Sequence, residues 1–115
     1  MTRALVLIVD DEPAFLRMVA AAVRILGCEA VAAPDAESAI ELMRESRPDL
    51  ALVDVRLPDM DGVELARLIK SEHAIPVLLM SGFGRPAVHQ ADRFLAKPFH
   101  IDELSSAINP YLSKS

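Results

Sequence analysis

The sequence lacks the residues that build disulfide-bonded, membrane-spanning or nucleic-acid-binding proteins. Its one cysteine, Cys28, cannot form an internal disulfide, and tryptophan is absent. The apolar run from Ala4 to Val9 stops at two aspartates, which makes it too short for a membrane span or a signal-peptide core. A net charge of −5 disfavours direct binding to nucleic acid or to an anionic membrane. We therefore expect a cytoplasmic protein with neither partner.

What is present points to one globular domain. The 115 residues are 52% hydrophobic and 25% charged, a size and composition that fit a single domain spanning residues 1–115. Short apolar runs alternate with stretches of helical period, which is typical of an α/β fold with a parallel sheet and crossover helices. The runs that predict strands are Ala4–Val9, Glu29–Ala32, Leu50–Asp54, Val77–Met80 and Phe94–Ala96.

Four stretches have the spacing and end signals of full helices. The first begins at 11–13 and ends at Gly27, and the second is capped by Asp35 and stopped at 47–48. The third follows the turn at 56–62, and the last is expected to kink or end near Asn109 because Pro110 follows. The first helix is expected to turn an apolar stripe inward, formed by Phe15, Met18, Val19, Ala22 and Leu26.

One crossover is unusually short. Only the eleven residues from Phe83 to Arg93 separate Gly82 from the last strand. A crossover with its helix needs at least about ten to twelve residues. We therefore expect a shortened fourth helix of one or two turns, near Pro86 to Gln90.

Charged residues gather at the ends of the predicted strands. Asp10 and Asp11 follow the first strand, Asp54 closes the third, and Lys97 follows the last. Because the carboxyl ends of parallel strands meet at one crevice, these side chains are expected to converge. Carboxylates that lie close together repel one another. Two of them about 4 Å apart repel by roughly 4 kcal/mol at an effective dielectric near 20, so a cation is expected among them. The sequence thus predicts a metal site with a nucleophile.

Three segments together resemble the receiver domain of two-component response regulators. They are Val9–Pro13, Leu52–Gly62 and Phe94–Phe99, and the resemblance covers essentially the whole chain. It implies a flavodoxin-like, doubly wound, five-stranded parallel sheet of order 2-1-3-4-5. In that order the first and third strands are neighbours, which places their terminal acids side by side.

The resemblance also implies a phosphoryl-accepting site. Asp54 is the implied phosphoacceptor, which takes a phosphoryl group from a histidine kinase or a histidine phosphotransfer protein. Asp10, Asp11, Asp54 and the main-chain carbonyl of Arg56 are the implied Mg²⁺ ligands. The protein is then a signalling domain rather than an enzyme, although it assists its own phosphorylation and dephosphorylation.

Three further roles follow from the same resemblance. Lys97 and the Ser81 hydroxyl are implied to contact phosphoryl oxygens. Ser81 and Phe94 are implied to form a switch, in which the hydroxyl moves toward the phosphate and the ring repacks inward. The signal then passes through protein contacts to a downstream protein or effector domain, and a phosphorylation-dependent dimer is compatible with this reading.

Other readings of the acidic site remain open. A small phosphohydrolase with Asp54 or Asp10 as a transient nucleophile predicts multiple turnover, whereas a receiver stops at one phosphoryl group. A pseudo-receiver would bind protein partners without accepting phosphate. A flavin carrier of similar architecture is disfavoured, because the loop after the first strand is acidic. Arg56 and Phe83 are expected to flank the path of an attacking water, which predicts slow self-dephosphorylation.

Overall fold

The computed structural model describes residues 3–84 and 91–112. Its strands form one parallel sheet of order β2-β1-β3-β4-β5, which confirms the predicted fold. The strands are β1 (Leu5–Val9), β2 (Glu29–Ala33), β3 (Leu50–Asp54), β4 (Val77–Ser81) and β5 (Arg93–Ala96). The helices of the described residues are α1 (Pro13–Ile25), α2 (Ala36–Ser46), α3 (Gly62–His73) and α4 (Ile101–Leu112).

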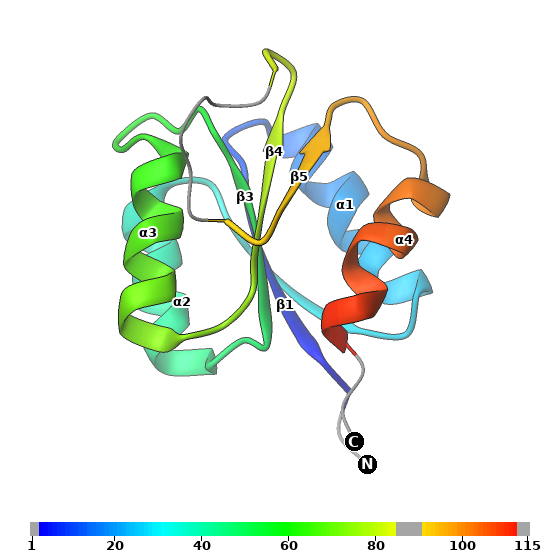
Figure 1. Ribbon diagram of the computed structural model, residues 1–115, viewed down its shortest axis with the longest axis horizontal. Helices are drawn as coiled ribbons and strands as arrows, with labels where there is room; N and C mark the ends of the chain where they lie inside the picture. The colour runs from blue at the N-terminus through cyan, green and yellow to red at the C-terminus, as the bar shows by residue number, and fades with distance from the viewer. Residues whose placement is uncertain (1–2, 85–90, 113–115) are drawn as a thin grey trace.

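The helices cover the sheet on both faces, α2 and α3 on one side and α1 and α4 on the other (Figure 1). Successive residues of a strand face opposite sides of a sheet, so the central strands must be apolar throughout. In β1, Val6 and Ile8 belong to the core on the α1 and α4 side, while Leu7 and Val9 belong to the core under α2 and α3. The sheet is thereby held rigidly between two cores, and its strand ends are fixed in place.

The predicted inward stripe of α1 is partly wrong. Met18 is 52% exposed, whereas Ala20 and Val23 are buried together with Val19. The helix carries alanines on several of its faces, and a small apolar residue can be buried or exposed at little cost. Its apolar pattern therefore does not fix how the helix is rotated about its axis, and packing against β1 and β2 decides it.

Of the two outcomes expected from Pro110, a kink or an end near Asn109, the last helix does not show the end. It runs to Leu112, with Pro110 inside its final turn. Tyr111 and Leu112 pack against the core on that side, and the Tyr111 hydroxyl donates a hydrogen bond of 3.4 Å to the carbonyl of Asp92. This packing holds the last turn, although the proline removes one backbone hydrogen bond and its ring crowds the carbonyl four residues earlier.

The expected fourth helix at Pro86 to Gln90 lies outside the described residues, and its prediction stays open. Residues 91 and 92 lead directly into β5, which pairs with β4. Within 3–84 and 91–112, no helix is both long enough and apolar enough to cross a membrane.

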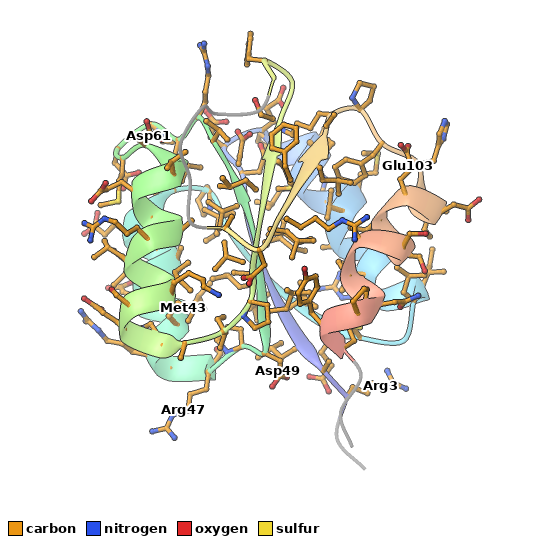
Figure 2. The ribbon with its side chains drawn as sticks, viewed as in Figure 1. Arg3, Met43, Arg47, Asp49, Asp61 and Glu103 are labelled. Atoms are coloured by element: carbon orange, nitrogen blue, oxygen red, sulfur yellow. The ribbon has the colours of Figure 1, made fainter. Side chains whose placement is uncertain are left out.

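The loop after β3 is fastened to its neighbours by two acids. The carboxylate of Asp59 accepts hydrogen bonds of 3.0 Å from the backbone N–H groups of Ala36 and Glu37, at the start of α2. These bonds, that to Ala36 foremost, lower the pKa of Asp59. Asp61 caps α3, at the end of the sheet opposite Asp49 (Figure 2). The loop that follows Asp54 is therefore held in a defined position.

Candidate functional site

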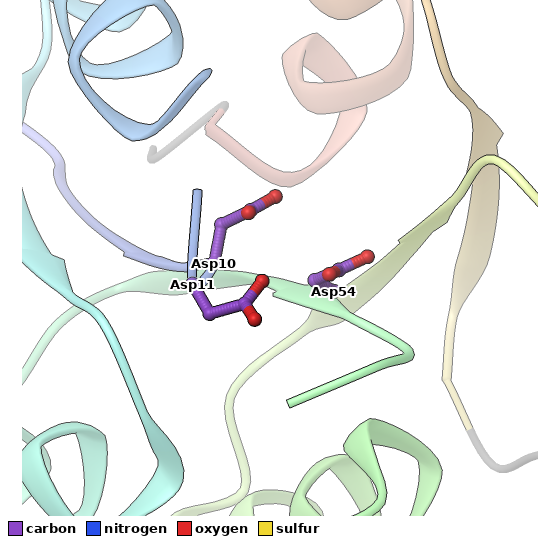
Figure 3. A group of neighbouring side chains, drawn as sticks. All are labelled: Asp10, Asp11 and Asp54. Carbon is purple, nitrogen blue, oxygen red and sulfur yellow. The ribbon is translucent and has the colours of Figure 1, made fainter. Parts of the chain in front are cut away.

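Three aspartates converge at the carboxyl end of the sheet. Asp10 and Asp11 follow β1, and Asp54 is the last residue of β3, the strand hydrogen-bonded to β1. Each offers a carboxylate oxygen, and these three oxygens lie within 4.8 Å of one another (Figure 3). Asp10 is fully buried and Asp54 is 7% exposed, while Asp11 is open to solvent. The pairing of the two strands thus brings together acids that are 43 to 44 residues apart, the difference between 54 and 11 or 10.

Lys97 brings the balancing charge from the far edge of the sheet. Its backbone N–H donates to the carbonyl of Ser81 at 2.9 Å, which extends the pairing of β4 and β5 by one bond. Its Nζ lies 2.7 Å from Asp10 Oδ2 and 3.4 Å from Asp54 Oδ1. The lysine side chain is only 12% exposed, so these ion pairs are poorly screened by water.

The charges change one another's proton affinity. Burial is the main cause that raises the pKa of Asp54, and the negative charge of Asp10 raises it further, against the lowering effect of Lys97. For Lys97, burial acts to lower the pKa, but the ion pairs with Asp10 and Asp54 outweigh it and the pKa is raised. The lysine therefore stays protonated at neutral pH. Its single positive charge does not balance the three carboxylates of the cluster.

A hollow of about 650 Å³ opens over this cluster. Asp11, Asp54 and Lys97 are among the residues that line it. At its rim the guanidinium carbon of Arg56 lies 4.0 Å from the ring centroid of Phe83, a cation–π contact across the mouth. Phe83 is otherwise 75% exposed. An anion that enters the hollow can reach both the buried carboxylates and the lysine.

Ser81 and Phe94 lie on neighbouring strands near the site. Ser81 ends β4, is 2% exposed, and its Oγ accepts a hydrogen bond of 2.9 Å from the backbone N–H of Phe83. Its hydroxyl proton remains able to donate elsewhere. Phe94 lies in β5, half-buried against the core under α2 and α3. Phe94 pairs with Leu79, two residues before Ser81 in β4, and the switch role of the two residues stays a prediction.

The donor set fits a divalent cation. Asp10 Oδ2 is buried, has the Lys97 ammonium nearby and has no hydrogen bond of normal geometry among the described residues. Carboxylate oxygens in a partly open, water-accessible site are the ligands that Mg²⁺ prefers, since it retains several waters. The oxygens of Asp10, Asp11 and Asp54 offer that set, while Arg56 lies in the loop just after β3, with its backbone bridged to Asp61.

Two residues near Lys97 were not predicted as part of the site. The Glu12 carboxylate lies 3.6 Å from Lys97 Nζ, and the ring centroid of Phe15 lies 4.2 Å from the same atom. Sequence analysis assigned Phe15 only to the core stripe of α1. The sequence offers no signal for this contact, because Asp11 precedes α1 and the spacing of four residues to Phe15 does not place the two on one helix face.

Comparisons with known proteins agree with this geometry. The family model of the response regulator receiver domain matches residues 6–109. The chain is 36% identical over 119 residues to the "Probable transcriptional regulatory protein TcrX" of Mycobacterium tuberculosis, and 32% identical over 114 residues to the heme response regulator HssR of Staphylococcus aureus. These matches cover 96% and 94% of the chain but 50% and 51% of the relatives, so the chain spans about half their length.

Solved structures of the same class superpose closely. The chemotaxis protein CheY4 of Vibrio cholerae gives a TM-score of 0.89 at 27% identity, with 96% of this chain and all of the other covered. The response regulator TrrA of Thermotoga maritima, solved with Mg²⁺ and BeF, gives 0.88 at 25% identity, with 95% and 99% covered.

The chain belongs to the response regulator receiver domains of two-component systems. Members of this family are signalling domains that interact with histidine kinases and downstream effectors, and they bind Mg²⁺ at an acidic pocket. In this chain Asp10, Asp11 and Asp54 form an acidic cluster.

Proposed function

We propose that this chain, as one receiver domain over residues 1–115, accepts a phosphoryl group on Asp54 from the phosphohistidine of a histidine kinase or a histidine phosphotransfer protein. The observation that carries the proposal is the position of Asp54. Its carboxylate is at the floor of the open hollow, 3.4 Å from Lys97 Nζ and within 4.8 Å of oxygens from Asp10 and Asp11. A nucleophile, a fixed cation and a metal-binding donor set thus meet at one point.

The reaction is a transfer between two nucleophiles. A carboxylate oxygen of Asp54 forms a bond to phosphorus while the bond from phosphorus to the donor imidazole nitrogen breaks. The electron pair of the broken bond stays on that nitrogen. The ammonium of Lys97 is within reach to bind an oxygen of the phosphoryl group, and the Ser81 hydroxyl is a second donor. No general base on the protein is required, because Asp54 reacts as a carboxylate.

Magnesium is the cofactor that the site requires. We propose that Asp10, Asp11, Asp54 and the carbonyl of Arg56 hold Mg²⁺, which supplies positive charge to offset the phosphoryl oxygens. This chain's own contribution is to keep two of the carboxylates buried beside Lys97, so that their negative charge is poorly solvated without a cation. The acidic cluster can then accept an anion.

The proposed output is a change of conformation that a partner protein reads. Phosphorylation is proposed to draw the Ser81 hydroxyl toward the phosphate and to let Phe94 repack inward, a local charge change that biases two packings. The recipient is a downstream protein or an effector domain, with a phosphorylation-dependent dimer as one form of that output. The proposed compartment is the cytoplasm.

The experiment that tests the proposal is incubation with acetyl phosphate and Mg²⁺, followed by intact-protein mass spectrometry. We expect the mass of one phosphoryl group to be added, and Asp54→Asn to abolish the addition. Asp102→Asn is the matched control, because it removes an acid from the exposed first turn of α4. Uptake by Asp54→Asn at the rate of the unchanged protein contradicts the assignment, and rapid consumption of many equivalents of acetyl phosphate indicates a hydrolase.

The side chains of Arg56 and Phe83 are expected to slow the loss of the phosphoryl group from Asp54. Arg56 and Phe83 lie over the mouth of the hollow in contact with each other, where they hinder the in-line approach of water to phosphorylated Asp54. Replacing both with alanine is expected to raise the dephosphorylation rate by about tenfold, the effect of roughly 1.4 kcal/mol on the barrier. The rate is followed by loss of the phosphorylated mass after removal of acetyl phosphate, and an unchanged half-life refutes the prediction.

A further inference from the structure

The Lys97 ammonium has a partner that carries no charge. Its Nζ lies 4.2 Å from the ring centroid of Phe15, which projects from the first turn of α1. The Phe15 ring is in turn packed edge-to-face against Phe99, with centroids 5.6 Å apart and planes at 80°. Two segments that are distant in sequence, the start of α1 and residues 97–99, thus meet beside one cation, and the proposed chemistry of Asp54 does not account for the aromatic part.

We propose that Phe15 is a positioning residue for Lys97, one that holds the ammonium over the phosphoryl-binding site through a cation–π contact. The inference rests on the proposed function and deepens it, because it names what keeps the lysine in place during phosphoryl transfer. In this role Phe15, which lines the hollow beside Lys97, acts through the lysine rather than directly on Asp54 or the phosphoryl group.

The lysine needs such a partner because its other partners have competing tasks. Its ammonium lies 2.7 Å from Asp10, 3.4 Å from Asp54 and 3.6 Å from Glu12. The first two are the carboxylates proposed to hold the metal and the phosphoryl group, so their hold on the lysine weakens when the site is loaded. The third carboxylate, that of Glu12, belongs to a side chain that is 69% exposed, so it holds the ammonium only weakly. The ring of Phe15 remains available throughout.

The ring is also well placed to hold the cation. A lysine side chain has four rotatable methylene groups, and it loses much freedom when its head group is confined. The negative face of an aromatic ring attracts an ammonium more strongly where water is excluded, and the Lys97 side chain is only 12% exposed. Contact with Phe99 adds ordinary packing around the ring, which a leucine at residue 99 can largely replace.

A pair of leucine variants separates this role from ordinary packing. Phe15→Leu and Phe99→Leu each remove the same ring–ring contact, but only Phe15→Leu removes the ring face under Lys97. Phe15→Tyr keeps that face and serves as the rescue. The first readout is the NMR shift of the Lys97 ε-methylene in metal-free protein, which the ring current of Phe15 displaces upfield. The second is the rate of phosphorylation by acetyl phosphate at saturating Mg²⁺.

We expect Phe15→Leu to abolish the upfield displacement and to slow phosphorylation by roughly three- to tenfold, from the strength of partly buried cation–π contacts. Phe99→Leu and Phe15→Tyr are expected to keep most of the displacement and to stay within about twofold of the original rate. Equal effects of the two leucine variants, or an unshifted Lys97 resonance in the unchanged protein, overturn the inference.

The outcomes also separate this inference from the proposed function. The displacement of the Lys97 resonance is measured without metal or phosphoryl donor, so it reports the contact whether or not Asp54 is the phosphoacceptor. If Asp54→Asn is phosphorylated normally, the proposed function fails while the resonance still reports on Phe15. If Asp54→Asn is inert and Phe15→Leu reacts like the unchanged protein, only the positioning role fails.

Discussion

Gly62→Ala is expected to destabilise the fold by about 3 kcal/mol and to disrupt the site at the same time. A Cβ at residue 62 would lie 1.9 Å from the backbone oxygen of Asp54 and 2.8 Å from the Cα of Val55. Both neighbours are backbone atoms, so no side-chain rotation can relieve the overlap. Overpacking of a rigid interior typically costs about 1–3 kcal/mol, and a backbone clash this close belongs at the upper end.

The structural reason is the close approach of α3 to the end of β3. The Gly62 N–H donates a hydrogen bond of 2.7 Å to the carbonyl of Val55, which draws the start of the helix onto the residues beside the proposed phosphoacceptor. A displaced helix start therefore moves the backbone of Asp54. We expect slower uptake of phosphate from acetyl phosphate in addition to the loss of stability.

Urea denaturation of Gly62→Ala measures the effect, and Gly82→Ala provides the matched control. A Cβ at Gly82 would meet no atom within 4 Å, so that variant is expected to change the free energy of unfolding by no more than about 0.5 kcal/mol. If both variants unfold at the same urea concentration as the unchanged protein, the close approach of α3 to β3 is wrong.

Lys97→Met is expected to lower the free energy of unfolding by about 3–5 kcal/mol at neutral pH without metal, and to abolish measurable phosphorylation. Removing one partner of a buried ion pair leaves the other charge uncompensated, which is the source of the cost. Here the abandoned groups are Asp10, whose side chain is fully buried, and Asp54, whose side chain is 9% exposed. Methionine keeps the length and most of the volume of the side chain, so the effect reports charge.

Three controls separate charge from packing in Lys97→Met. Lys70→Met breaks the ion pair between Lys70 and Asp92, two side chains that are 31% and 29% exposed. It is expected to lower the free energy of unfolding by less than about 1 kcal/mol. Added Mg²⁺ is expected to stabilise Lys97→Met more than the unchanged protein, because a divalent cation replaces the lost charge. Equal stabilisation of both proteins by Mg²⁺ speaks against the electrostatic account.

The third control is pH. Burial already raises the pKa of Asp54, and the variant loses the lowering effect of Lys97. A carboxyl whose pKa is raised by folding binds protons more tightly in the folded state, so its cost to stability grows as the pH rises through that pKa. The deficit of Lys97→Met is therefore expected to shrink as the pH is lowered from neutral through the raised pKa of Asp54, in denaturation curves recorded at each pH.

Most of the architecture could be predicted from local patterns. Buried parallel strands must be apolar on both faces, and runs such as Leu50–Val53 therefore stand out from the helical stretches between them. Helix ends could also be predicted from the sequence, since Asp35 caps α2 as expected. The continuation of α4 through Pro110 was not readable, because it depends on the contacts of Tyr111 with the core and with Asp92.

The residues of the site also divide into those that the sequence predicts and those that it does not. Asp10, Asp11, Asp54 and Lys97 could be predicted because they are charged residues at the ends of apolar runs. Few other positions in a buried strand tolerate a charge. Phe15 was missed as a neighbour of Lys97, since an aromatic residue in an amphipathic helix has the same pattern whether it fills a core or faces a cation. The difference lies in the rotation of α1, which its alanines leave open.

The order of polar and apolar residues along the chain thus determined by itself which segments become strands and helices, and which charges stand at strand ends. Only the tertiary structure decided how near those charges come to one another, how far α1 turns, and which ring meets the Lys97 ammonium. The physical reason is range. Secondary structure follows from periodicity over neighbouring residues, whereas ion pairs, desolvation and cation–π contacts depend on distances of a few ångströms between segments far apart in the chain.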